Sequence, residues 1–284
     1  MERRLSHSQN YFRDPVMVKE LVEKTKITAE DVVVEIGAGK GIITAELAKK
    51  ARKVIAVEVD KQLYSELVEK LRGLDNVELI NTDFMTWALP QGPYKVFANI
   101  PFNMTAEIVG RLIGDERSPE LVYLIMQDKA AERFVGQPVA KDTQISILLK
   151  NEFEVEIITK INRREFVPRP MVDAVLLVLK KRDKPLVRAK DRQMWRDFVV
   201  YGYNQWKPTI LGAFVKVFSH EQRQKLEKKI RTLDKPRDLT IEQWRSLFGE
   251  FNLYVNEEKK TLVRGAESKL KKQQQKLTKI HRRR

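Results

Sequence analysis

The sequence predicts an α/β protein in which a mostly parallel sheet carries helices on both faces. Five short runs of apolar and β-branched residues alternate with helix-like segments, which is typical of βαβ units. The runs are almost continuously apolar, as expected for strands that are buried on both faces. A glycine-rich turn at residues 37–41 follows the first of these strands. Together the three observations predict a doubly wound, Rossmann-like sheet.

The expected elements follow one another in a regular order. Strands are expected at residues 31–37, 53–59, 77–83, 94–100 and 120–126. Helices are expected at residues 42–51, 61–72, 104–113 and 129–135. Two further strands, at residues 153–161 and 172–181, are separated only by a short polar link that contains proline. We expect these two strands to pair antiparallel at the end of a sheet of about seven strands.

The pattern changes near residues 182–185. Beyond residue 191 the apolar residues recur at three- and four-residue spacing, as Trp195, Phe198 and Val199 do, which predicts helices. The segment TIEQ at residues 240–243 resembles a capping box in front of another apolar helix. We therefore expect a sheet domain at residues 1–182, a small helical domain at 183–255 and a tail at 256–284.

Positive charge is concentrated in the second part of the chain. The net charge is +15, yet residues 1–182 hold 28 Lys and Arg against 27 Asp and Glu, whereas residues 183–284 hold 26 against 12. A one-sided surplus of this size favours a polyanionic partner. Residues 268–284, with eight basic residues and no acidic one, predict a mobile arm or a helix that orders on RNA. The tail lacks the large aromatics and clear apolar face of a membrane-surface helix, so nucleic acid is the preferred partner.

Composition also excludes several kinds of site. The chain has no cysteine, which removes disulfides and thiolate chemistry. Its three histidines, His7, His220 and His281, are far apart and show no ligand spacing, so we expect no metal. No segment approaches 18 apolar residues and the first residues contain no apolar signal core, so we expect a cytoplasmic protein without a membrane span.

The first candidate site is the run EIGAGKG at residues 35–41, where an expected strand leads into a glycine-rich turn. Glycines allow a ligand to approach the backbone closely, because no Cβ stands in the way. The run is no P-loop, because it lacks the Lys-Ser or Lys-Thr pair, and its GxGxG spacing differs from the GxGxxG of dinucleotide sites. Taken alone, it identifies a ligand turn but no particular ligand.

Two acidic residues extend this site along the expected sheet edge. Glu58 ends the second strand, where a carboxylate accepts both hydroxyls of a ribose. Asp83 ends the third strand, where an acid would take an adenine amino group. The two acids and the glycine turn predict a crevice for an adenosine cofactor, and both a nicotinamide dinucleotide and S-adenosyl-L-methionine remain possible at this point.

The end of the fourth strand distinguishes these two cofactors. Its sequence is NIPF at residues 99–102, in which the Asn99 amide adjoins a rigid X-Pro turn and Phe102 offers a flat stacking surface. Such a corner suits an amino group on a planar heterocycle, such as N6 of adenine. Hydrogen bonds from the amino group to the Asn99 side-chain oxygen and a backbone carbonyl would favour a tetrahedral, nucleophilic nitrogen, with catalysis mostly by positioning. Methyl transfer from S-adenosyl-L-methionine follows as the expected reaction.

The chain resembles a known family over residues 6–182. NIPF looks like the (N/D)-(I/L)-P-(Y/F) motif of amino-methyltransferases. With SQNYF at residues 8–12 and FVPRPMVD at 166–173, it resembles the rRNA adenine N6-methyltransferases. Lys40, Gly41 and Ile100 are similar to the Erm branch, which methylates large-subunit rRNA, rather than to the small-subunit dimethyltransferases. The resemblance implies that residues 1–182 form the sheet of a class I S-adenosylmethionine-dependent methyltransferase. It also implies that the helical domain at 183–255 binds RNA.

The resemblance also implies roles for individual residues around the cofactor. Asn10 and the backbone at Phe12 would lie over its methionine part, and Gly37 would line its carboxylate and ribose side. Glu58 matches the ribose acid and Asp83 the adenine acid.

Three residues would serve the target adenine. Asn99 would hold its amino group, Phe102 would stack on the base, and Phe166 would pack near the flipped ring, although Phe166 also suits a core position. Family members commonly have tyrosine in place of Phe102, so the stacking face is kept and a hydroxyl contact is lost.

An Erm-type enzyme would act as a monomer on an adenine of 23S rRNA, in the peptidyl transferase loop of domain V, and would confer resistance to macrolide, lincosamide and streptogramin B antibiotics. The first alternative is a 16S-type small-subunit dimethyltransferase, or a transcription factor descended from one. A non-catalytic RNA-binding protein is a second alternative, and the intact site residues speak against it. A DNA adenine methyltransferase would carry D-P-P-(Y/F), which is absent, and the GxGxG spacing makes a nicotinamide dehydrogenase the weakest alternative.

Overall fold

The computed structural model describes residues 10–100, 104–114, 117–231 and 233–281. The chain forms two compact units. The first contains residues 1–131 and 153–182, and the second contains residues 132–152 and 183–284. Each unit has its own core and is described separately.

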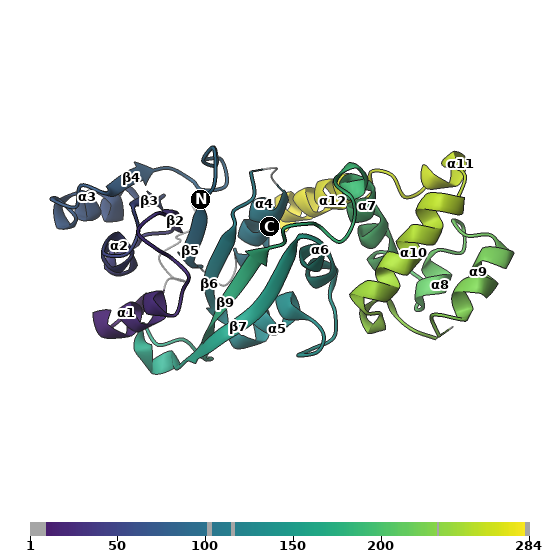
Figure 1. Ribbon diagram of the computed structural model, residues 1–284, viewed down its shortest axis with the longest axis horizontal. Helices are drawn as coiled ribbons and strands as arrows, with labels where there is room; N and C mark the ends of the chain where they lie inside the picture. The colour runs from purple at the N-terminus through teal and green to yellow at the C-terminus, as the bar shows by residue number, and fades with distance from the viewer. Residues whose placement is uncertain (1–9, 101–103, 115–116, 232, 282–284) are drawn as a thin grey trace. The chain divides into compact units, whose positions relative to one another are not determined.

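A seven-stranded sheet forms the centre of the first unit, with strand order β4-β3-β2-β5-β6-β9-β7 (Figure 1). The strands are β2 (Val32–Ile36), β3 (Lys53–Glu58), β4 (Val77–Asn81), β5 (Lys95–Asn99), β6 (Leu121–Gln127), β7 (Phe153–Ile161) and β9 (Ala174–Lys181). The first five are parallel, and β9 runs antiparallel between β6 and β7. The predicted fold class and the antiparallel pairing of the last two strands are therefore confirmed.

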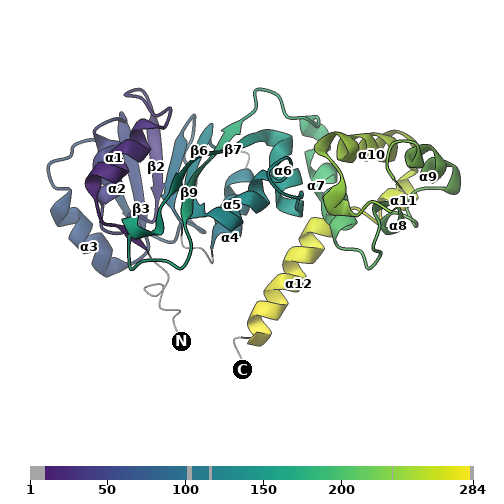
Figure 2. The ribbon, with the colours of Figure 1, turned by 90° about the horizontal axis from the view of Figure 1, so that it is seen from below.

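Alternating side chains of the strands face two helical layers. Val33, Val54 and Phe97 belong to the core cluster shared with α1 (Pro15–Glu23), α2 (Ile42–Ala48) and α3 (Lys61–Lys70). Figure 2 shows these three helices on one side of the sheet and α4 (Thr105–Gly114) on the other. Because both faces of the sheet are covered, the strands are continuous runs of apolar residues. The helix α5 (Asp128–Val135) follows β6 directly.

The helix α1 was not predicted, although the sequence contains the residue types that typically start a helix. The side chain of Asp14 accepts a hydrogen bond from the Val16 amide at 2.8 Å, and Pro15 occupies the first helical turn, where its missing N–H costs nothing. Asp60 caps α3 in the same way.

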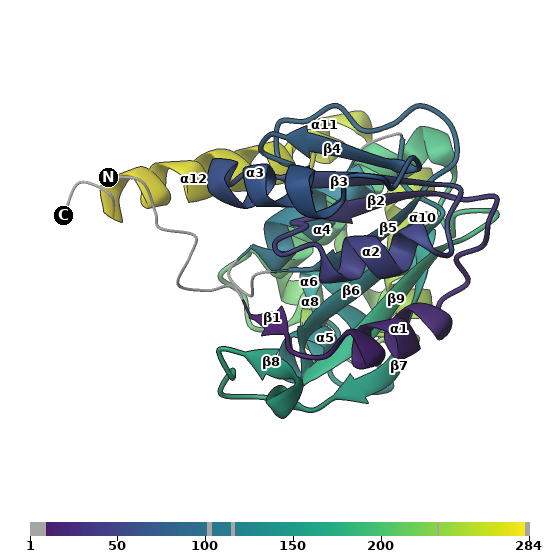
Figure 3. The same ribbon diagram turned by 90° about the vertical axis from the view of Figure 1, so that its left-hand side faces the viewer.

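A second, two-stranded sheet lies beside the main one and was also not predicted. β1 (Tyr11–Phe12) pairs antiparallel with β8 (Phe166–Val167), as Figure 3 shows. The 3-10 turn η2 (Arg163–Glu165) precedes β8. The pairing brings together two motifs that lie more than 150 residues apart in the sequence.

The second unit is a helical bundle around Phe198, whose ring stacks on Phe214 with centroids 4.4 Å apart. Its helices are α6 (Gln144–Glu152), α7 (Arg192–Tyr203), α8 (Ile210–Ala213), α9 (His220–Glu227), α10 (Ile241–Tyr254), α11 (Glu257–Lys260) and α12 (Ala266–His281), with 3-10 turns at η3 (Ala189–Asp191) and η4 (Pro236–Asp238). The capping box at the start of α10 is present, because the Thr240 hydroxyl and the Gln243 side chain bond each other's backbone amides.

Two predicted boundaries differ from the structure. Residues 132–152 were expected in the sheet domain, but Ile147 and Leu148 of α6 are buried in the core of the helical unit. The segment 256–284 was expected to be a separate tail, but Val263 is fully buried in that same core and Leu270 packs against it. The segment 268–284 was expected to be a mobile arm or to order only on RNA, and its described part is instead helical in the unbound chain.

Candidate active site

The candidate site lies where the strand order reverses. β2 and β5 are parallel neighbours from which the sheet extends in opposite directions, and ligands of such sheets bind at the carboxyl ends of these two strands. Gly37 directly follows β2, and Asn99 is the last residue of β5. The fold therefore places the glycine turn and the predicted target-binding amide at one edge.

The glycine turn has the geometry of a ligand cradle. Gly37, Gly39 and Gly41 all have positive φ values, of 75°, 56° and 73°. A Cβ at Gly37 would have no atom within 4 Å, whereas one at Gly39 would lie 2.9 Å from the Tyr11 ring. The backbone at Gly37 thus faces open space, and Tyr11 covers the next part of the turn, with the Lys40 ammonium 4.9 Å from its ring centre.

The Glu58 carboxylate is fixed by two backbone amides. It accepts a hydrogen bond from Gly39 at 2.8 Å and one from Asp60 at 2.9 Å, each through a different oxygen. The side chain is buried, with 1% of its surface exposed. Because a carboxylate has about four acceptor positions, both oxygens retain capacity for a ribose hydroxyl. The predicted ribose acid therefore adjoins the glycine turn.

Asp83 lies two residues beyond β4, on an exposed turn that Arg111 of α4 holds in place. The Asp83 side chain accepts a hydrogen bond from the Met85 amide at 2.8 Å. The Arg111 guanidinium donates to the carbonyls of Met85 and Trp87 and lies 5.3 Å from the centre of the Phe84 ring. Arg111 was not among the predicted site residues, and no motif in the sequence indicates that it reaches this turn.

Asn99 and Asn10 are in direct contact. The side-chain amide of Asn99 donates a hydrogen bond to the Asn10 backbone carbonyl at 2.8 Å. This contact orients the amide and leaves its oxygen as an acceptor, because the nitrogen carries the donors. The prediction that both residues belong to one site therefore has a geometric basis.

The aromatic predictions have mixed outcomes. Phe12 and Phe166 pack on each other across the small sheet, with ring centroids 4.5 Å apart and exposures of 5% and 2%. In this state Phe166 supports Phe12 from within the core and presents no open face, so a contact with a target base remains a prediction. Phe102 lies outside the described residues.

Glu35 is a buried acid beneath the glycine turn. Neither of its carboxylate oxygens meets a hydrogen-bond partner among the described residues. The pKa of Glu35 is raised to about 8, mainly by burial; the nearby Thr44 hydroxyl lowers this pKa in part, and the charge of Glu58 adds to the rise. Glu35 is therefore largely protonated at neutral pH.

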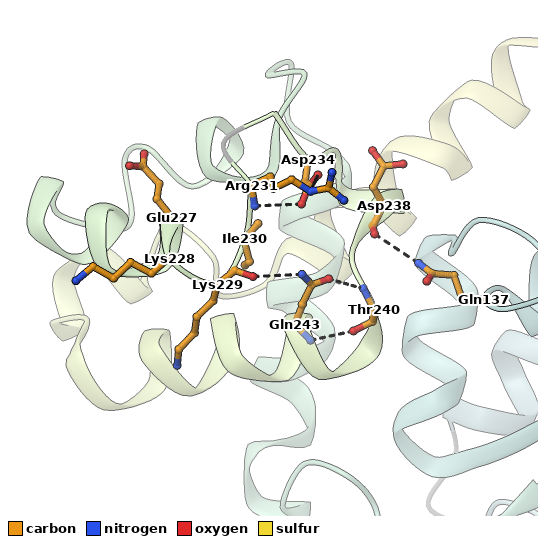
Figure 4. A pocket seen from close by; sticks show the side chains of 10 residues that line it. All are labelled: Gln137, Glu227, Lys228, Lys229, Ile230, Arg231, Asp234, Asp238, Thr240 and Gln243. Carbon is orange, nitrogen blue, oxygen red and sulfur yellow. Dashed lines mark hydrogen bonds and ion pairs between the residues drawn. The ribbon is translucent and has the colours of Figure 1, made fainter.

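A separate polar pocket lies in the helical unit, lined by the end of α9 and the segment after it, by η4 and by the start of α10 (Figure 4). Its lining includes the capping turn of α10, where the Gln243 side chain donates to the Lys229 carbonyl at 3.3 Å. None of the predicted site residues lines it. Within the described ranges no three His, Asp or Glu side chains are grouped as metal ligands would be. None of the described helices is both long and apolar enough to cross a bilayer.

The sheet order, with an antiparallel β9 inserted between β6 and β7, and a ligand cradle at the switch point define a class I methyltransferase. The family description "Ribosomal RNA adenine dimethylase" matches residues 1–253, and the chain belongs to this family. It is accordingly an enzyme of the rRNA adenine N6-methyltransferase class.

Individual relatives fall into two groups. An rRNA adenine N-6-methyltransferase of Limosilactobacillus reuteri is 30% identical over 89% of this chain and 98% of its own length. A ribosomal RNA small subunit methyltransferase A of Caldanaerobacter subterraneus subsp. tengcongensis is 31% identical over 90% of this chain and 100% of its own length. Among solved structures, the 23S rRNA methyltransferase ErmE superposes with a TM-score of 0.76 at 26% identity, over 86% of this chain and all of that chain.

Proposed function

We propose that this protein transfers methyl groups from S-adenosylmethionine to the N6 of one adenine in the peptidyl transferase loop of 23S rRNA domain V, as a cytoplasmic monomer. Methylation there would block macrolide, lincosamide and streptogramin B antibiotics sterically. The observation that carries the proposal is the Asn99–Asn10 hydrogen bond at the end of β5, because it prepares an acceptor for an exocyclic amino group.

The residues at the switch point suit the proposed cofactor. The open backbone at Gly37 gives room for its methionine carboxylate and ribose, and the free acceptor positions of Glu58 suit the ribose hydroxyls. Asp83, on its exposed turn, remains available to the adenine amino group. Asn10 and the backbone of Phe12 would lie over the methionine part. When bound, S-adenosylmethionine supplies an electrophilic methyl group on its sulfonium.

The Asn99 amide would act on the target base by positioning. Its oxygen accepts a hydrogen bond from the adenine N6 amino group, which draws the nitrogen lone pair out of conjugation with the ring. Because an amide does not titrate, Asn99 does not accept a proton. The proton that the N6 nitrogen loses after methylation is transferred to water. Phe102 would stack on the base and Phe166, behind Phe12, would support this wall of the site. The target has to leave its stack, which costs least in a single-stranded loop.

The large-subunit target rests on sequence details and on the similarity to ErmE, a 23S rRNA methyltransferase. Lys40, Gly41 and Ile100 match the Erm pattern. The small-subunit relative at 31% identity favours a second candidate, methylation of 16S rRNA by the same chemistry.

A methyl-transfer assay on protein-free 23S and 16S rRNA, followed by mapping of the modified nucleotide, tests the proposal. Label on one adenine of the 23S peptidyl transferase loop is the expected result. Label confined to 16S rRNA would keep the chemistry and overturn the large-subunit target, whereas no label on either RNA would overturn both.

A further inference from the structure

A buried polar network anchors the start of α12 to α7. The Arg196 guanidinium donates two hydrogen bonds to the Glu267 carboxylate, at 2.9 and 2.7 Å. The Asp197 carboxylate accepts hydrogen bonds from the backbone amides of Gly265 and Glu267, at 2.9 and 3.0 Å, and so caps α12 from a neighbouring helix.

The ion pair in this network is charged at neutral pH. Burial alone would raise the pKa of Glu267, but hydrogen bonds and charge from Arg196 and Lys271 lower the pKa to about 2. A bidentate, two-point attachment of this kind fixes orientation as well as position. The network therefore determines the direction in which α12 leaves the core.

The next turns of α12 are basic and exposed. Residues 271–276 are all exposed, and Lys269, Lys272 and Lys276 have no ion-pair partner among the described residues. The spacing of these three lysines places them on one face of the helix, over a length of about 10 Å. Leu270, which packs against the core, lies on another face of the helix.

Among the described side chains of α12, those of Ala266 and Leu270 pack against the apolar core of the unit, and both lie before the exposed residues 271–276. Isolated helices of this length are marginal in water, so attachment at one end gives the basic face its persistence. The match to the family description ends at residue 253, which places α12 outside the part shared with the family.

We propose that α12 is an additional RNA-binding element, whose lysine face contacts the phosphate backbone of structured rRNA and whose anchor at Arg196, Asp197 and Glu267 fixes its direction. The inference rests on the proposed rRNA substrate. It assigns the charge of the described part of the tail to a helix that is anchored to the core, and not to a flexible arm. A row of cations at helical spacing complements phosphates, and one face of unpaired lysines without large aromatics does not suit insertion into a lipid surface.

The first test neutralises the basic face in the full-length protein. The change Lys269→Gln, Lys272→Gln and Lys276→Gln is compared with an equal loss of charge on the sheet unit, Lys19→Gln, Lys24→Gln and Lys61→Gln. We expect the α12 variant to lower the slope of log affinity against log salt for a structured rRNA fragment by about two to three, because each lost phosphate contact removes nearly one counterion. Methyl transfer at saturating RNA should stay within about twofold.

The second test separates geometry from charge. Glu267→Gln removes a negative charge, so simple attraction predicts tighter RNA binding. If RNA binding requires α12 to be anchored, the variant should bind RNA more weakly, because Arg196 loses its charged partner and α12 is no longer held in its direction. Circular dichroism establishes that the variant is folded.

Three outcomes would overturn the proposal. An unchanged salt slope in the triple α12 variant would remove the phosphate contacts, and tighter binding by Glu267→Gln would indicate a flexible arm. Loss of binding to phosphatidylserine vesicles with an unchanged RNA slope would assign the helix to a membrane surface. Since binding is measured on any structured rRNA fragment, these results do not depend on which adenine the enzyme methylates.

Discussion

The Asn99 side-chain amide and the Asn10 backbone carbonyl are joined by a hydrogen bond of 2.8 Å. This bond links the last residue of β5 to the residue that precedes β1. β1 in turn is held by β8 and by the packing of Phe12 on Phe166. The two-stranded sheet therefore determines where the Asn99 oxygen points, although most of it is distant in sequence.

Replacement of Asn99 by Asp tests this orientation. The change keeps an acceptor oxygen but removes the donor to Asn10, and a carboxylate oxygen would then face a carbonyl oxygen. We expect kcat for methyl transfer to fall about 100-fold, as for other misplaced reacting groups, with little change in the KM for S-adenosylmethionine.

Asn76→Asp is the matched control. The Asn76 amide also donates to backbone carbonyls, those of Ala48 and Ala51 at 2.8 and 3.0 Å, but away from the site. It should lower the melting temperature and leave kcat unchanged. Equal kcat values for Asn99→Asp and the wild type would show that the donor to Asn10 is dispensable.

The sequence predicts the sheet well because burial on both faces leaves a direct trace in composition. The continuous apolar runs locate all seven main strands to within three residues at each end. It does not predict β1 and β8, since a two-residue strand carries no periodic pattern and depends on a partner far along the chain. The assignment of residues 132–152 failed for a similar reason, because which core Ile147 and Leu148 join is decided by tertiary packing.

The sequence predicted only those site residues that stand at the end of a strand and whose residue type is required by the function. Gly37, Glu58 and Asn99 each follow or end a strand, so topology alone brings them to one edge. Arg111 could not be found in this way. It lies within an amphipathic helix, and its contact with the turn after Asp83 exists only once α4 packs on the sheet.

Replacement of Gly37 by Ala tests the ligand cradle. Gly37 has a φ of 75° and a Cβ there would enter open space, so the new methyl group meets a ligand before it meets protein. We expect at least a tenfold weaker affinity for S-adenosylhomocysteine by isothermal titration calorimetry. The backbone strain should cost about 1–2 kcal/mol of stability.

Gly73→Ala is the control variant, because it introduces a comparable backbone strain away from the site. Gly73 has a φ of 96° and a Cβ there also has no neighbour within 4 Å, but it lies in the turn after α3. Its stability loss should equal that of Gly37→Ala while its affinity stays at the wild-type value. Similar affinities for both variants would remove Gly37 from the binding site.

Replacement of Arg111 by Lys tests the support of the Asp83 turn. Lysine keeps the charge but cannot bridge the carbonyls of Met85 and Trp87, because it lacks the planar fork of donors. We expect the KM for S-adenosylmethionine to rise about five- to tenfold, with kcat nearly unchanged. A fall in kcat at constant KM would contradict a role in holding the cofactor side.

Glu35 predicts an unusual pH dependence of stability. Its folded pKa of about 8 lies above its ordinary value of 4.5, so between these pH values the folded chain binds a proton that the unfolded chain has lost. The free energy of unfolding contributed by this group is therefore fully present below pH 4.5 and falls as pH rises towards 8, by up to about 1.4 kcal/mol per pH unit. In Glu35→Gln the amide does not titrate, so the variant should gain stability relative to the wild type from pH 5 to pH 8 and keep a constant difference above that range. Urea unfolding of both proteins at each pH unit from 5 to 9 measures this difference. Parallel curves would show that Glu35 is ionised in the folded state and that a partner for its carboxylate has to be sought.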